Sequence, residues 1–149
     1  MALNTPRIFF GRLPQTADGG DSRLGRDRHH RALRTAIMHE PGAIPVPTAI
    51  LSEVDYLLGA KLSVQAELDL LDDILGGAFT LEPFTSADLK RSRELIHQYS
   101  TLDLGLADAA VIAAAERVGT RRILTVDERH FRVVRAADGK PFTLLPADA

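Results

Sequence analysis

The chain has 149 residues and a formal net charge of −2, so it can form one domain with a hydrophobic core, and only a local basic rim could attract nucleic acid. It contains no cysteine, which excludes disulfides and thiolate metal sites and fits a cytoplasmic protein. It has no apolar run of the roughly 18 residues that a membrane span needs, so we expect no membrane partner.

The first 26 residues differ in composition from the rest of the chain. The run RIFF at positions 7–10 could begin a strand, and the segment after it is rich in Gly, Asp and Arg without apolar periodicity. We therefore expect an atypical N-terminal segment over 1–26, of loop or disordered type, followed by one domain over 27–149.

Helical and strand patterns alternate from residue 30 onward. The predicted helices cover 30–38, 49–58, 64–75, 87–99 and 109–118, and the predicted strands cover 43–46, 79–83, 122–126 and 142–145. Thr48, Ser63 and Ser86 stand where helix N-caps are expected, and Gly119 stands at a helix end. Short strands separated by helices predict an α/β fold with a parallel sheet covered by helices.

Two aspartates lie where carboxylates are costly. Asp108 shares a predicted helical face with Val111 and Ala115. Asp127 directly follows the apolar run 123–126, and sites in open α/β sheets form at the carboxyl ends of strands. An acid on an apolar face requires an ion-pair partner, a hydrogen bond or a bound cation. The two acids therefore suggest a shared metal ion.

Glu53 is a third candidate, because it lies on the same predicted helical face as Ile50 and Ala60. Each acid also has a structural alternative: Glu53 could be a helix-edge residue, Asp108 an N-cap and Asp127 a turn residue. If the three carboxylates converge, they repel one another unless a divalent cation neutralises them. Oxygen ligands without cysteine or a clear histidine set predict Mg²⁺ or Mn²⁺ rather than zinc.

Other polar residues are interpreted as structural. Asp103 is expected in a loop or cap. His29 and His30 would point about 100° apart on a helix, so we do not expect them to bind one ion together. His130 is expected at a strand exit.

The segments PTAILSEVDYLL, LDLGLADAAVIAAAERVGTRRILTVDERHF and FTLLP resemble PIN-domain proteins, specifically the VapC-type toxins of bacterial toxin–antitoxin pairs. The resemblance covers about residues 29–146. It implies a PIN-like three-layer α/β/α sandwich with a mostly parallel sheet, and a Mg²⁺- or Mn²⁺-dependent ribonuclease. It also implies an RNA substrate, a cognate VapB-type antitoxin and a homodimer. Glu53, Asp108 and Asp127 match three of the family's catalytic, metal-binding acids, and Thr125 would support the site.

One acid of the family pattern is missing. The first strand of the family ends in an acid followed by Thr-Ser or similar, which should fall near 13–17, where this chain has Gln15 and Thr16. Asp18 and Asp21 are nearby but follow no apolar strand. We therefore interpret residues 1–26 as not homologous to the start of the family, and the fourth metal ligand is unassigned.

Two functions stay open at this point. The first is a metal-dependent endoribonuclease toxin of a type II toxin–antitoxin pair, cleaving RNA phosphodiester bonds at an acidic Mg/Mn site. The second is a catalytically impaired PIN-like remnant that only binds antitoxin or RNA, which the missing acid favours. A third alternative is an unrelated small α/β protein. Six arginines could form a phosphate-contacting rim or a solvated surface: Arg91, Arg93, Arg121, Arg122, Arg129 and Arg132.

Overall fold

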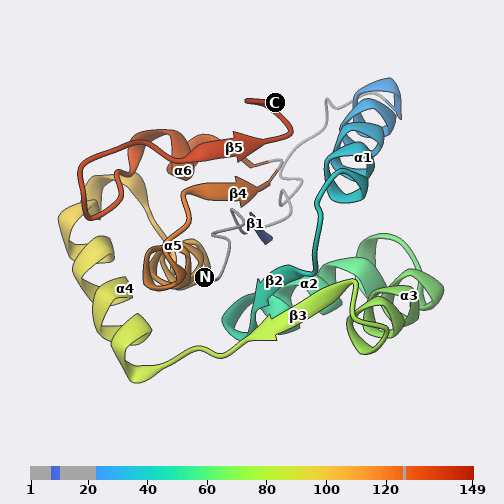
Figure 1. Cartoon of the computed structure of the whole chain (residues 1–149), viewed down its shortest axis with the longest axis horizontal. Coiled ribbons are helices and arrows are strands. Elements are labelled where there is room, and N and C mark those ends of the chain that lie inside the picture. Colours follow the sequence, from blue (N-terminus) through green and yellow to red (C-terminus); the bar gives the residue numbers. More distant parts are fainter. Residues whose placement is uncertain (1–7, 11–22, 126) are drawn as a thin grey trace.

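The computed structural model describes residues 8–10, 23–125 and 127–149 (Figure 1). The elements are, in chain order, β1 (Ile8–Phe10), α1 (Arg23–Met38), β2 (Ile44–Pro47), α2 (Thr48–Lys61), α3 (Val64–Leu75), β3 (Phe79–Glu82), α4 (Ser86–Gln98), the 3₁₀ turn η1 (Ser100–Leu102), α5 (Leu106–Val118), β4 (Arg122–Leu124), α6 (Arg129–Val133) and β5 (Thr143–Leu145).

The strands form parallel pairs. One sheet has the order β1-β4-β5 and a second pairs β2 with β3, and each of these pairings is parallel. Strand β1 also contacts β2, so the two sheets lie next to each other (Figure 1). Helix α2 packs against α3, α4 packs against α5, and α5 also contacts α2, β1 and β2. The prediction of an α/β fold with a parallel sheet and covering helices is confirmed.

The N-terminal segment contributes a strand. The predicted start of a strand in RIFF is confirmed as β1, which pairs with β4 and contacts β2. Gln15, Thr16, Asp18 and Asp21 lie outside the described residues. The division of the chain into 1–26 and 27–149, and the interpretation of the first part as non-homologous, therefore stay predictions.

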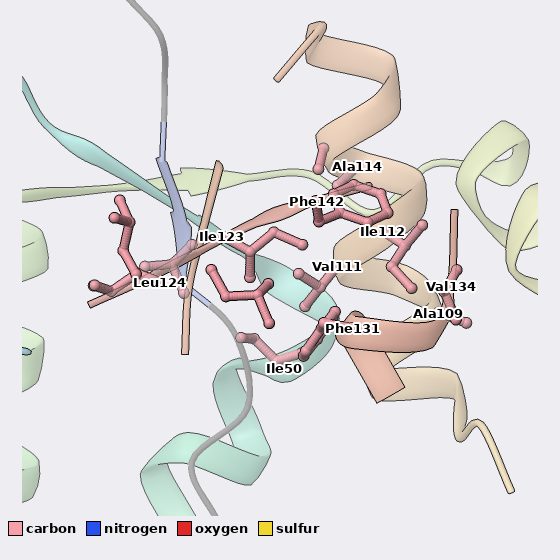
Figure 2. Close-up of a cluster of buried hydrophobic side chains, with 14 of the residues drawn as sticks. Ile50, Ala109, Val111, Ile112, Ala114, Ile123, Leu124, Phe131, Val134 and Phe142 are labelled. Atoms are coloured by element: carbon pink, nitrogen blue, oxygen red, sulfur yellow. The ribbon is translucent and has the colours of Figure 1, made fainter. Parts of the chain in front are cut away.

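Helix α5 lies at the centre of the hydrophobic core. Every residue from 108 to 115 is buried, because small alanine side chains on several faces allow α4 and the strands to approach closely. Figure 2 shows Val111 of this helix near Ile50 of α2 and Phe131 of α6. The core thus joins α2 and α5, which carry Glu53 and Asp108, to α6, which follows Asp127 in the chain.

The ends of α3 and α5 are as expected. Ser63 is confirmed as the N-cap of α3, and its hydroxyl accepts a hydrogen bond from the N–H of Ala66 at 3.1 Å. Gly119 ends α5 with a φ of 77°, a left-handed conformation that glycine adopts without steric cost. None of the helices in the described residues is long and apolar enough to span a bilayer.

Two other predicted N-caps are wrong by one residue. Helix α2 begins at Thr48, whose hydroxyl accepts a hydrogen bond from the N–H of Phe84 instead of capping the helix. Helix α4 begins after Thr85, which forms a reciprocal capping box with Asp88. In both places the predicted cap lies next to the true one. In α2 the contact of Thr48 with Phe84 takes the hydroxyl away from the helix, and in α4 the capping box makes Thr85 the N-cap.

Candidate active site

Asp108 lies inside the first turn of α5, where Gly105 is the N-cap, so the N-cap alternative for Asp108 is wrong. The side chain is almost fully buried, with an exposed fraction of 2%. Its Oδ2 is 2.6 Å from Nδ1 of His130. Its Oδ1 is buried and has no hydrogen-bond partner within the described residues.

The unsatisfied Oδ1 is the most informative atom of this site. A buried polar atom without a partner costs about 1–3 kcal/mol, so such atoms are rare unless they serve a function. A carboxylate only accepts hydrogen bonds, so this oxygen can be satisfied by a donor or by a cation. Hard divalent cations prefer carboxylate oxygens. Oδ1 of Asp108 is therefore a suitable ligand for Mg²⁺ or Mn²⁺, the cations on which nucleases of the family that the sequence resembles generally depend.

Asp127 lies just beyond the carboxyl end of β4 and is also buried. Its two oxygens accept a bidentate pair of hydrogen bonds from Arg129, from Nε at 3.0 Å and from Nη2 at 2.8 Å. These hydrogen bonds hold the pKa of Asp127 below its ordinary value, although burial opposes them. The Arg129 backbone N–H also points to Oδ1, at 3.4 Å. The turn role that was one alternative for Asp127 is thus present, together with its position at the strand end.

Thr125 holds the backbone of Asp127. The threonine hydroxyl accepts a hydrogen bond from the Asp127 N–H at 3.1 Å and donates to the Asp127 carbonyl at 3.2 Å. Thr125 is itself buried, and its N–H donates to the carbonyl of Leu145 in β5. The expected supporting role of Thr125 therefore has a physical form: it ties the end of the sheet to the acid.

The helix α6 was not predicted, and the expectation that His130 lies at a strand exit is wrong. Arg129 is the first residue of this helix and His130 the second. Phe131 and Val134 are buried three residues apart and anchor the helix in the core. This anchor brings the imidazole of His130 to Asp108. The apolar pair at helical spacing is the sequence signal that could have identified α6.

Arg129 and His130 connect the two acids electrostatically. Arg129 is stabilised first by Asp127 and also by the charge of Asp108, and both effects raise the pKa of Arg129. His130 lies close enough to Asp127 to contribute to the low pKa of this acid, after the larger effect of Arg129. We call these four side chains, Asp108, Asp127, Arg129 and His130, the acid–base cluster. It combines two carboxylates with a guanidinium and an imidazole from adjacent positions of one helix.

Glu53 is half-buried on α2 beside the buried Val54, and it has a polar or electrostatic interaction of its own. The hydrogen bonds between Asp108 and His130 and between Asp127 and Arg129 do not involve Glu53. Among residues 8–10, 23–125 and 127–149, no group of three or more Asp, Glu, His or Cys side chains is arranged to hold a metal ion. The structure thus links Asp108 and Asp127 through their basic neighbours, and the catalytic and metal roles of Glu53, Asp108 and Asp127 stay predictions.

Several arginines of the predicted rim form ion pairs with acids. These pairs join Arg91 to Glu116, Arg121 to Asp138, Arg122 to Glu40 and Arg132 to Asp148. Arg121 and Arg122 lie at the start of β4, whereas Asp127 follows the end of this strand. Arg129 is the member of the predicted rim that belongs to the acid–base cluster, through its ion pair with Asp127.

Comparisons with known proteins agree with this architecture. A family model described as PIN domain matches residues 23–136. Over 117 residues the chain is 35% identical to Ribonuclease VapC26 of Mycobacterium tuberculosis. This alignment covers 78% of this chain and 87% of that protein. The chain therefore belongs to the PIN domain family, among the VapC-type ribonucleases, and the resemblance seen in the sequence is confirmed.

Solved structures of VapC toxins share the fold. The crystal structure of Mycobacterium tuberculosis VapC20, a sarcin-ricin loop cleaving toxin, matches with a TM-score of 0.64 and 17% identity, covering 81% of this chain and 90% of that one. A toxin–antitoxin complex from Klebsiella pneumoniae matches with a TM-score of 0.59 and 17% identity, covering 85% and 92% respectively. At this identity the likeness concerns the fold alone.

Proposed function

We propose that this protein is an endoribonuclease toxin of a type II toxin–antitoxin pair, which cleaves RNA phosphodiester bonds with the help of Mg²⁺ or Mn²⁺. The observation that carries the proposal is the buried Oδ1 of Asp108, which has no hydrogen-bond partner within the described residues. A second buried acid, Asp127, follows the end of a parallel strand and pairs with Arg129, the neighbour of the His130 that contacts Asp108. Membership of the VapC-type ribonucleases supports the reaction class.

Asp108 and Asp127 would hold the cation, with Glu53 as the proposed third ligand. When bound there, a cation of this kind would supply an activated water near neutral pH and positive charge at the phosphodiester and the leaving oxygen. Asp108 presents one oxygen while His130 holds the other, and Thr125 holds the backbone of Asp127. The substrate would be single-stranded or looped RNA, because such a strand can be splayed into a site.

The proposed partners follow from the relatives. A cognate VapB-type antitoxin is supported by the fold shared with a protein of the Klebsiella pneumoniae toxin–antitoxin complex. A homodimer and a cytoplasmic location are further parts of the proposal, since VapC-type toxins act on cellular RNA. The composition without cysteine is consistent with this location.

A remnant that binds antitoxin or RNA without cleaving is the second candidate. It is favoured by the absence of a three-residue metal group within the described residues and by the sequence near 13–17, which lacks the expected acid. In this case Arg129 and His130 would be permanent counter-ions of the two acids. The two candidates make opposite predictions for cells and for purified RNA.

Expression without an antitoxin tests the two candidates. A nuclease slows growth, and the Asp108→Asn variant abolishes this effect. Purified protein incubated with total RNA and Mn²⁺ should produce discrete RNA ends that the variant does not produce. A wild-type protein that folds, leaves growth unchanged and produces no RNA ends would contradict the nuclease and support the remnant.

A further inference from the structure

Arg129 combines tight pairing with high exposure. Its guanidinium donates two hydrogen bonds to the two oxygens of Asp127, at 3.0 and 2.8 Å. The Arg129 side chain is nevertheless 73% exposed, whereas that of Asp127 is only 8% exposed. The carboxylate is thus held in place by the fold, while the guanidinium reaches it from solvent.

The contacts that hold the backbone around Arg129 do not involve its side chain. Helix α6 is fixed by the buried Phe131, and the N–H of Arg132 donates to the carbonyl of Glu128. These contacts position the Arg129 backbone without restraining its long side chain. The guanidinium side of this ion pair faces water, and exchange with water weakens its hold on the carboxylate. The guanidinium can therefore leave Asp127 without disturbing the core.

A divalent cation and Arg129 need the same atoms. A bidentate guanidinium occupies both oxygens of a carboxylate, and a metal ligand must offer at least one of them. Arg129 also lies within the electrostatic reach of Asp108, so its positive charge opposes a cation at either acid. Binding of the cation thus competes with the guanidinium for the same two oxygens.

The displaced guanidinium would lie beside the site with no carboxylate to bind. Its planar fork matches a phosphate as well as it matches a carboxylate. The other arginines that pair with acids are held by residues outside the cluster, for example Arg121 by Asp138 and Arg91 by Glu116. Arg129 is therefore better placed than Arg91 or Arg121 to meet a phosphodiester at these acids.

We propose that Arg129 is an exchangeable internal counter-ion: it occupies Asp127 until a divalent cation displaces it, and it then binds a phosphate of the RNA next to the scissile bond. This inference rests on the proposed ribonuclease function. It assigns Arg129 two successive partners of the same chemical class, a carboxylate oxygen and a phosphate oxygen. The residue thereby couples loading of the metal to binding of the substrate.

Calorimetric titration of Mn²⁺ into the full chain tests the first half of the inference. Arg129→Ala should bind Mn²⁺ about two- to fivefold more tightly than wild type, as expected for removal of an exposed ion-pair competitor. Arg121→Ala is the matched control, because Arg121 is also an exposed arginine paired with an aspartate, but at the opposite end of β4. Its Mn²⁺ affinity should equal that of wild type.

Each outcome of this titration decides the point. Binding by Arg129→Ala alone, or tighter binding by it, supports the inference. Equal or weaker binding by Arg129→Ala overturns the inference and leaves the proposed nuclease intact. If neither protein binds Mn²⁺, both the inference and the metal site of the proposed function are wrong.

Binding of labelled single-stranded RNA tests the second half. At Mn²⁺ concentrations that saturate each protein, in the cold and with intact RNA verified on a gel, Arg129→Ala should bind several-fold more weakly than Arg121→Ala. The slope of log K against log salt should fall by about 0.7, the value of one phosphate contact on a single strand. Equal RNA affinity and equal slope in the two variants would overturn the phosphate contact.

Discussion

Nδ1 of His130 lies 2.6 Å from Oδ2 of Asp108, and this contact joins the short helix α6 to the first turn of α5. It fixes the rotation of the Asp108 carboxylate, and Oδ1 stays buried with no hydrogen-bond partner among the residues that the structure describes. A charged oxygen that is held rigidly is better prepared for a cation than one that must first be ordered.

The first prediction concerns Asp108→Asn. The substitution keeps the shape of the side chain but removes the charge, and its amide places an N–H donor among buried atoms. Residues that only support a metal ligand typically account for about a tenfold to hundredfold loss. We expect RNA cleavage by Asp108→Asn to fall by more than this. Cleavage rates with Mn²⁺ as the added cation provide the measurement. Activity within a factor of two of wild type would remove Asp108 from the site.

Asp88 supplies the second prediction, because it is an equally buried acid with a structural role. Burial alone would raise the pKa of Asp88, but hydrogen bonds from Arg117 and Thr85 outweigh this effect and leave the pKa below its ordinary value. Asp88→Asn should lower the free energy of unfolding by about 2 kcal/mol, the range of hydrogen bonds to charged groups. Cleavage per folded molecule should not change.

The pH dependence of unfolding tests the same acid. Because the pKa of Asp88 is lower in the folded protein than in the unfolded chain, its stabilisation is complete above the unfolded pKa and is lost as the pH falls through the folded one. Wild type should therefore lose more stability than Asp88→Asn below about pH 4. Parallel curves for the two proteins in urea titrations would refute the assignment.

The third prediction separates the two ends of β4. Thr125→Val leaves the buried N–H of Asp127 without its acceptor, so we expect a loss of about 1–3 kcal/mol in stability and a loss of about tenfold or more in Mn²⁺ affinity. Thr120→Val is the matched control, because the buried Thr120 hydroxyl accepts from the N–H of Arg122 at the start of the same strand. It should lose stability but keep its Mn²⁺ affinity. Equal Mn²⁺ affinity in both variants would show that Thr125 does not position the site.

Local signals explain which parts of the fold were predicted from the sequence. The helix that ends at Gly119 was recognised because apolar spacing and a left-handed glycine act within a few residues. Its start was placed at residue 109 instead of 106, and this error made Asp108 look like an N-cap. The box of Thr85 and Asp88 is also local, and the spacing of a threonine and an acid three residues apart would have identified it.

The remaining features depend on distant contacts. His130 meets Asp108 across 22 positions of the chain, and no periodicity near His130 encodes that contact. The central place of β1 depends on its neighbours β2 and β4, which are contributed by residues far along the chain. Arg129 was one of six equivalent arginines in the sequence. It becomes distinct only when α6 turns it toward Asp127.

The fourth prediction decides the role of Glu53. If Glu53 is the third ligand, Glu53→Gln removes one anionic oxygen and should weaken Mn²⁺ binding by tenfold or more, on the order of the loss for residues that support metal ligands. Asp55→Asn is the control on the same helix, because two positions along a helix point about 200° apart. It should leave the affinity unchanged. If both variants bind Mn²⁺ as wild type does, Glu53 is a helix-edge residue, and the cation is held by Asp108 and Asp127 with other ligands.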